Sequence, residues 1–252
     1  MNDTIIARLE SNSEKVRAQA AYLLANNNDE QAVHVLIKAL NDISPKVRRQ
    51  VAYALSTICP SSAVDSLIRA THDTDTETCR RIALTLGKIG RPEAITSLID
   101  LFFRDDTELH YAAQKALIRI GKPSIPALMN LYKNPSAQIR ALAVQALGRI
   151  GDIQAIDVFI QALSDTDKWI RWMTASIVCS IPDKRFIEPL TVRLDDTFMR
   201  WNAARALGYV GDESTMHILA AIVNDPNQDN SLRSKAEYAI KHIQRRIREG
   251  KY

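Results

Sequence analysis

Four aromatic side chains with helical spacing form the strongest candidate binding group in this 252-residue chain. Trp169 precedes Trp172 by three residues, and Phe198 precedes Trp201 by three, so each pair shares one face if its segment is helical. These four residues include all three tryptophans of the chain. Tryptophan is enriched in binding hot spots, and its ring stacks on bases and attracts cations. The group therefore predicts recognition of a partner or ligand.

Residue types that perform catalysis lack the spacing that catalysis needs. The cysteines Cys59, Cys79 and Cys179 form no CxxC pair, and we expect buried thiols that act as small hydrophobic groups. The five histidines never occur four residues apart: they are His34, His72, His110, His217 and His242. No nucleophile elbow and no phosphate-binding glycine loop occurs. We therefore expect no catalytic residue, no metal site and no required cofactor.

A short segment recurs eight times and must position these side chains. Its clearest copy spans residues 138–151. One position, which we call the Arg position, falls at residues 17, 48, 79, 110, 140, 171, 200 and 233, in steps of 31, 31, 31, 30, 31, 29 and 33. It is arginine in six copies, Cys79 in one and His110 in another. A fixed period of this length is typical of a solenoid, so we predict an all-α, right-handed α-α superhelix of about eight two-helix repeats, forming one continuous domain over residues 1–252.

Each repeat reads as a short first helix, a polar turn and a second helix that carries the Arg position. Turn acids such as Asp42 and Asp165 are expected to cap helices, and an arginine follows each by six residues. We predict a series of Arg–Asp contacts along the stack that is interrupted at Cys79 and His110. Glycines at the ends of second helices are expected to adopt the left-handed cap: Gly90, Gly121, Gly151 and Gly211.

The charge distribution gives weak support for nucleic-acid binding. The formal net charge is +4 and the pI is about 9.0. Five basic residues and one acid follow residue 240, so this tail carries the whole excess and residues 1–240 sum to zero. Phosphate binding needs basic residues along the binding face, so we interpret the tail as a solvated last helical turn and nucleic acid as an improbable partner. No apolar run of about 18 residues occurs, and we expect no membrane span and a cytoplasmic location.

The pattern Val/Ile-Arg-x-x-Ala-x-x-Ala-Leu-Gly-x-Ile-Gly, matched by residues 138–151 and nearly by 198–211, resembles the HEAT-like repeats of phycobilisome lyase proteins. Proteins of this type include bilin lyase subunits, phycobilisome degradation factors, hydroxylases and scaffolds, so the resemblance is specific for fold. The related deoxyhypusine hydroxylases place a His-Glu pair after the Arg position to hold iron. No His-Glu pair occurs in this chain, which argues against a di-iron hydroxylase.

The same resemblance implies a concave groove lined by the residue after each Arg position. In this chain the position after Arg includes Arg49, Arg80, Tyr111, Trp172 and Trp201. Trp169 and Phe198 precede Trp172 and Trp201 by three residues, so we expect them on the same helix face. Arg81 directly follows Arg80 in the sequence. This surface would suit a linear tetrapyrrole with propionates, an acidic partner helix, or a flipped base with its phosphates. The rings could instead pack between repeats.

We therefore expect a non-catalytic protein-binding module. The resemblance implies a phycobiliprotein or another tetrapyrrole-bearing protein as partner, or a second HEAT-like subunit, with attachment, escort or detachment of the bilin as the task. If a bilin binds, the tryptophans would stack on it while Arg49 and Arg80 meet its carboxylates. Two alternatives remain: a nucleic-acid enzyme resembling the HEAT-like alkylpurine DNA glycosylases, and a scaffold without a small-molecule ligand.

Overall fold

The computed structural model describes residues 2–27 and 29–250, and all regular secondary structure in these residues is helical. Short 3-10 turns precede or extend many of the helices. The first helices of the repeats are α1 (Asn2–Ala7), α3 (Glu30–Ala39), α5 (Val64–Ala70), α7 (Ile95–Asp100), α9 (Ile125–Leu131), α11 (Ile156–Ala162), α13 (Ile187–Val192) and α15 (Glu213–Asn224). The second helices are α2 (Glu14–Leu23), α4 (Pro45–Ile58), α6 (Thr76–Ile89), α8 (Thr107–Ile120), α10 (Ala137–Ile150), α12 (Lys168–Ile177), α14 (Arg200–Val210) and α16 (Asn230–Arg248). The predicted all-α architecture of repeated helix pairs is confirmed.

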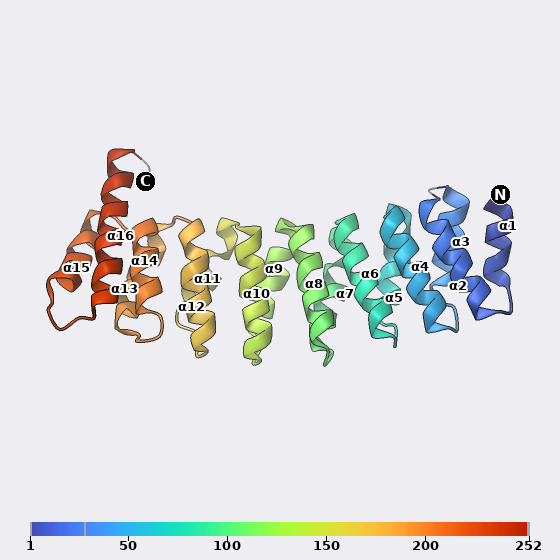
Figure 1. Ribbon diagram of the computed structural model, residues 1–252, viewed down its shortest axis with the longest axis horizontal. Helices are drawn as coiled ribbons and strands as arrows, with labels where there is room; N and C mark the ends of the chain where they lie inside the picture. The colour runs from blue at the N-terminus through green and yellow to red at the C-terminus, as the bar shows by residue number, and fades with distance from the viewer. Residues whose placement is uncertain (1, 28, 251–252) are drawn as a thin grey trace. The chain divides into compact units, whose positions relative to one another are not determined.

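The chain divides into two compact units, Met1–Ala127 and Leu128–Tyr252, which are described separately below as unit 1 and unit 2. The boundary falls within α9. Figure 1 colours unit 1 from blue to green and unit 2 from green to red. The expectation of one continuous domain over residues 1–252, with a right-handed superhelical course, stays a prediction.

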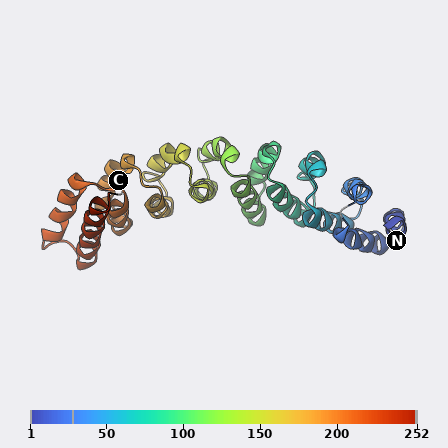
Figure 2. The same cartoon turned by 90° about the horizontal axis from the view of Figure 1, so that it is seen from above.

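Within each unit the second helices pack side by side in one layer, and the first helices form the other. The two layers of unit 1 are visible as separate rows when the molecule is seen from above (Figure 2). Fully buried leucines from both layers meet between them, for example Leu36 and Leu67 from first helices and Leu55 and Leu86 from second helices. Such layering buries one apolar face of each helix and leaves the outer face of the second helices to solvent.

Several helix ends follow the expected turn chemistry, but two of the predicted glycine caps do not. Asp75 and Asp106 are N-caps whose carboxylates accept backbone N–H bonds, and Gly90 adopts the left-handed cap with φ of 75°. Gly151 also adopts the left-handed cap, with φ of 69°. The predicted left-handed cap is wrong at Gly121, where φ is 79° but ψ is −136°, and at Gly211, where φ is −70°.

The exception at Gly211 has a steric cause. A Cβ there would lie 2.4 Å from the carbonyl oxygen of Leu207 and 2.8 Å from Thr215 Cγ2, so glycine serves close approach of the chain to α15. The left-handed position that the sequence did not indicate is Cys59, with φ of 52°.

The basic tail forms the end of α16, as predicted. Arg246 Nη1 donates to the carbonyl oxygens of Gly208 and Gly211, at 3.4 and 3.0 Å, and so satisfies acceptors at the end of α14. Lys251 lies outside the described residues. Within residues 2–27 and 29–250, none of the helices combines the length and apolarity needed to span a bilayer. The cytoplasmic location stays a prediction.

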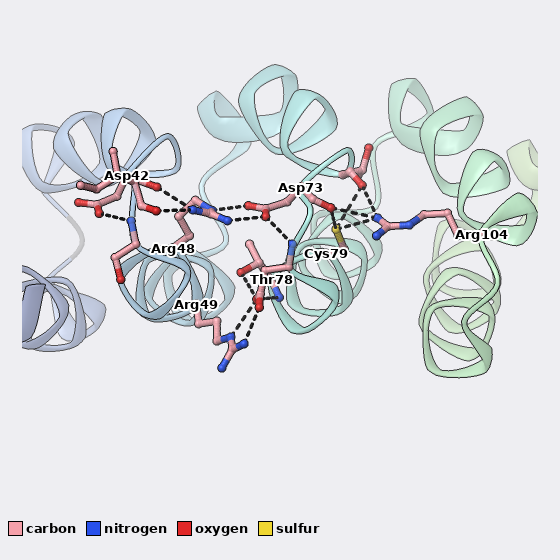
Figure 3. Close-up of polar contacts among 11 residues, drawn as sticks. Asp42, Arg48, Arg49, Asp73, Thr78, Cys79 and Arg104 are labelled. Atoms are coloured by element: carbon pink, nitrogen blue, oxygen red, sulfur yellow. Dashed lines mark hydrogen bonds and ion pairs between the residues drawn. The ribbon is translucent and has the colours of Figure 1, made fainter.

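The predicted series of Arg–Asp contacts is present, and we call it the ladder. Each of its Arg–Asp pairs, which we call a rung, joins two successive turns. Arg48 donates Nε and Nη2 to the Asp73 carboxylate at 2.6 and 2.7 Å (Figure 3). Its Nη1 donates to the carbonyl oxygens of Asp42 and Ile43 at 2.8 and 3.3 Å. The carboxylate that Arg48 binds therefore belongs to Asp73, 25 residues later. Asp42, six residues earlier, binds Arg48 through its backbone carbonyl oxygen. The matching pairs are Arg17–Asp42, Arg140–Asp165 and Arg171–Asp196.

The predicted interruption of the Arg–carboxylate series at Cys79 is confirmed, but a guanidinium from the following turn replaces the missing one, an arrangement that we call the inverted rung. Residue 104, 25 positions after Cys79, is arginine where five other repeats have aspartate. Arg104 Nη1 donates to Cys79 Sγ at 3.1 Å and to the Asp73 carbonyl oxygen at 3.2 Å (Figure 3). Cys79 Sγ donates to the same carbonyl at 3.0 Å. The guanidinium thus reaches the same turn from the opposite side.

His110 retains one ladder interaction. Its Nε2 lies 2.7 Å from the carbonyl oxygen of Arg104, six residues earlier, so Nε2 carries the proton. Its ring stacks on Phe102 with centroids 5.8 Å apart. An imidazole therefore takes over the bond to the carbonyl that arginine makes elsewhere.

Candidate functional site

Three of the four aromatic side chains, which together we call the aromatic patch, lie on the adjacent second helices α12 and α14 of unit 2 as predicted, and the fourth, Phe198, lies in the turn before α14. Trp169 and Trp172 belong to α12, Phe198 precedes α14, and Trp201 lies in its first turn. The Trp169 ring contacts Phe198 edge-on at 4.9 Å and Trp172 at 6.3 Å between centroids. The exposed fractions of the three tryptophans are 60%, 42% and 45%. About half of the tryptophan surface therefore faces solvent.

Two turn aspartates hold the backbone of the aromatic patch in place. Asp167, the N-cap of α12, accepts the backbone N–H of Trp169 at 2.8 Å. Asp196 accepts Nε of Arg171 and the backbone N–H of Phe198, both at 2.9 Å. Burial raises the pKa of Asp196, but these hydrogen bonds outweigh burial and leave its pKa below the ordinary value. An ionised Asp196 thus ties the helix of Trp169 to the turn of Phe198.

Cations border the aromatic patch. Lys168 Nζ lies 5.0 Å from the centroid of the Phe198 ring and 5.9 Å from that of Trp169. The Arg200 guanidinium carbon lies 5.9 Å from the centroid of Trp201. These separations are within the range of cation–π attraction.

A pocket of about 300 Å³ opens beside Trp172, between α10 and α12. Its lining includes Met173 and Ile177, and Arg149 stands in its wall. Gly148 also lines it, and a Cβ at Gly148 would lie 2.7 Å from Ile177 Cγ2. The absence of a side chain at Gly148 therefore lets α12 approach α10. The sequence pattern had indicated neither this pocket nor Arg149.

The predicted cationic residues belong to unit 1, where carboxylates of the chain engage them. Arg49 donates through Nε and Nη2 to Asp75, with a distance of 2.8 Å for the Nε bond (Figure 3). The Arg49 guanidinium holds the pKa of Asp75 well below its usual range. Arg80 and Arg81 both donate to Glu77, at 2.7 and 2.6 Å. A ligand carboxylate would have to displace these partners, and recognition by Arg49, Arg80 and Arg81 stays a prediction.

Tyr111 is half-exposed and lines a pocket of about 160 Å³ with Arg80 and Lys115. A second aromatic contact in unit 1 was not predicted: Tyr22 stacks on Tyr53 with centroids 5.7 Å apart. Both tyrosines follow the Arg position by five residues, and this shared offset is the sequence signal that could have identified them.

The thiols do not form a reactive site. Cys79 is buried, and burial raises the pKa values of Cys79 and Cys179 above the ordinary value. Both thiols are therefore protonated at neutral pH and poorly nucleophilic. Among the residues that the structure describes, no three His, Cys, Asp or Glu side chains are grouped as a metal site would require.

Comparisons with known proteins agree on the fold. The family model described as HEAT repeats matches six overlapping stretches: residues 2–84, 44–118, 66–148, 103–177, 125–199 and 156–241. A search of curated protein sequences finds no match.

Three solved structures share the architecture at low sequence identity. The complex of CpcE and CpcF of phycocyanin lyase from Nostoc sp. PCC7120 is 19% identical, with a TM-score of 0.50, and the match covers 96% of this chain and 94% of that chain. The YibA protein of E. coli is 20% identical over 96% and 92% of the two chains, with a TM-score of 0.55. An engineered protein is 21% identical over 96% and 78%, with a TM-score of 0.51. At these identities the similarity shows the fold alone.

Proposed function

The chain belongs to the HEAT repeat family, and we propose that it is a non-catalytic protein-binding module that recognises its partner through the aromatic patch. The observation that carries the proposal is the exposure of three tryptophans, by 42–60%, on one side of adjacent repeats. Exposed apolar clusters of this kind mark interaction sites, and solenoids bind partners along the faces of stacked repeats. The hydrogen bonds from the backbone of Trp169 and Phe198 to Asp167 and Asp196 support the proposal because a pre-ordered surface loses little entropy on binding.

Comparative affinity purification tests the proposal. The full chain, a Trp169→Ala/Trp172→Ala/Trp201→Ala variant and a Phe103→Ala/Ile153→Ala control are each used as bait in extracts of the source organism. Phe103 and Ile153 are 65% and 71% exposed outside the patch, so the control removes comparable apolar surface. We expect proteins that bind the full chain and the Phe103→Ala/Ile153→Ala control but not the tryptophan variant. Their affinity for the tryptophan variant should be at least about tenfold weaker than for the full chain. Equal retention by all three baits would contradict the proposal.

Within this function, we propose a tetrapyrrole-bearing protein, such as a phycobiliprotein, as the partner. The resemblance of residues 138–151 to the repeats of phycobilisome lyase proteins supports this choice, as does the chemistry of the patch. Tryptophan rings provide flat stacking surfaces, and Lys168 provides a cation for a propionate. A second HEAT-like subunit is an alternative partner, since the solved phycocyanin lyase is a complex of two proteins.

A fluorescence titration with biliverdin, a linear bilin, tests the tetrapyrrole proposal. We expect saturable quenching of tryptophan emission, corrected for absorption by the ligand, that weakens in a folded Trp172→Ala/Trp201→Ala variant and persists in an Ile153→Ala control. Linear, non-saturable quenching, equal to that of N-acetyltryptophanamide, would contradict recognition of the free chromophore and leave a protein-only partner.

A further inference from the structure

Charge in unit 2 is separated between the two helix layers. The second helices α10, α12, α14 and α16 contain one acidic residue, Glu237, against twelve lysines and arginines. These are Arg140, Arg149, Lys168, Arg171, Arg200, Arg205, Arg233, Lys235, Lys241, Arg245, Arg246 and Arg248. The first helices α9, α11, α13 and α15 contain no lysine or arginine and three acids. Although the formal charges of residues 1–240 sum to zero, the second helices of unit 2 form a basic layer. The aromatic patch lies on this layer.

Three cations of this layer near the patch are not held in ion pairs with carboxylates of the described residues. Arg149 and Lys168 are exposed side chains. Arg205 donates Nη2 to Ser176 Oγ at 3.1 Å, and its buried Nε has no hydrogen-bond partner among the described residues. By contrast, Arg171 and Arg200 are paired with Asp196 and Asp229 in the ladder. Arg149, Lys168 and Arg205, which we call the free cations, are thus available to a partner.

The free cations adjoin the apolar part of the surface. Arg149 and Trp172 line the same pocket, together with Ser176, the residue to which Arg205 donates. Lys168 lies over the rings of Phe198 and Trp169. An apolar recess with cations at its edge complements a segment that carries apolar side chains on one side and carboxylates on the other.

We infer that the partner binds this surface through an acidic, amphipathic protein segment. Its apolar side chains pack on the aromatic patch and in the pocket beside Trp172, and its carboxylates meet the free cations. This inference rests on the proposed function and specifies the chemistry of the partner. It does not require a chromophore.

A protein segment fits better than a nucleic acid. Asp167 caps α12 two residues before Trp169, and Asp195 and Asp196 lie three and two residues before Phe198. A nucleic acid carries phosphates along its whole length and would have to pass these acids, whereas a protein segment can place its carboxylates only where the cations are. Arg140, Arg171 and Arg200 are already paired with aspartates of the chain, so they are not free to bind phosphates.

Selection from a phage-displayed library of random 16-residue peptides tests the inference on the full chain. Clones that also bind the Trp169→Ala/Trp172→Ala/Trp201→Ala variant are removed. We expect the remaining peptides to carry net negative charge with apolar or aromatic residues. Enrichment of neutral or basic peptides that depend on the tryptophans would overturn the acidic character and leave the proposed function intact. Absence of tryptophan-dependent clones would count against both.

A charge series provides the second measurement. The dissociation constant of an enriched peptide is measured for the wild type, Arg149→Gln/Lys168→Gln, Arg149→Glu/Lys168→Glu, and the matched control Lys38→Glu/Arg69→Glu on the first helices of unit 1. We expect binding about tenfold weaker in the Glu variant, an intermediate value in the Gln variant and no change in the control, with affinity falling as salt rises. Equal affinities across the series would overturn the inference.

A labelled single-stranded dT20 oligonucleotide distinguishes the other class of partner. We expect it to bind more weakly than the enriched peptides at 150 mM salt, a concentration at which counterion effects are already substantial (on the order of a tenfold loss or more relative to 50 mM). Tighter binding of dT20 than of any peptide, lost in the Arg149→Glu/Lys168→Glu variant, would overturn the inference and assign the surface to nucleic acid.

Discussion

The ladder shows that a structural role can move between residues without being lost. In four of the eight repeats a guanidinium at the Arg position reaches forward to an aspartate 25 residues later. At Cys79 the small thiol leaves space, and Arg104 fills it from the following turn. The Asp73 carbonyl oxygen is satisfied in either arrangement, which explains why the two substitutions occur together in one rung.

Exchange of the two residues in the inverted rung is the first prediction. Cys79→Arg places two guanidinium groups side by side, and Arg104→Asp places a carboxylate against carbonyl oxygens, so each single change is expected to lower the free energy of unfolding. The double variant has arginine at residue 79 and aspartate at residue 104, the same order as in the Arg48–Asp73 pair. We expect a favourable coupling of about 1–3 kcal/mol in a double-mutant cycle followed by urea unfolding. Additive effects would show that the two positions do not form one rung.

At the scale of helices, two glycines set how closely second helices pack. A Cβ at Gly87 of α6 would lie 2.5 Å from the Cα of Ala116 of α8, so the obstacle is backbone. At Gly148 the nearest atoms belong to the side chain of Ile177, which can rotate. The same position of the repeat is therefore sterically strict in one helix pair and adjustable in the other.

Alanine at these two positions should accordingly have different effects. We expect Gly87→Ala to lower the free energy of unfolding by about 1–3 kcal/mol through overpacking, beyond the gain in helix propensity of about 1 kcal/mol. For Gly148→Ala, rotation of Ile177 and the propensity gain should keep the change within about 1 kcal/mol. Urea unfolding followed by circular dichroism measures both. Equal losses would show that the helix spacing is not limited by backbone contact at Ala116.

For the whole molecule, the ion pairs of the ladder and of α6 predict loss of stability in acid. Hydrogen bonds from Arg17 and Arg80 hold the pKa values of Asp42 and Glu77 below their ordinary values. These carboxyls take up protons near pH 4 in the unfolded chain but only at lower pH in the folded chain, so their stabilisation is complete above about pH 5 and declines as pH falls through the folded pKa values.

The corresponding experiment compares the wild type with Asp42→Asn at pH 7, 5 and 3. We expect the variant to have the lower urea midpoint at pH 7 and the difference to shrink by pH 3, where the wild-type carboxyl has lost part of its advantage. A difference that does not change with pH would show that the charge of Asp42 does not contribute.

Features that depend on neighbours along one helix were predictable, whereas features that depend on residues one repeat apart were not. The offset of Trp169 from Trp172 is local, and the helix that it predicts is confirmed by α12. Arg49 meets Asp75 across 26 residues, and Arg104 compensates Cys79 across 25, so inspection of one aligned position could not reveal either pair. The net charge likewise hid the basic layer, which appears only when helices are sorted by layer.

Site-specific photo-crosslinking tests the central claim, that the aromatic patch is the partner-binding surface. p-Benzoylphenylalanine is placed at residue 169, 201 or, as a control, the exposed position 153, and the protein is irradiated in the cells that produce it. We predict one shared protein adduct from residues 169 and 201 and its absence from residue 153. An adduct that forms equally at residue 153, or from neither tryptophan position, would contradict the claim.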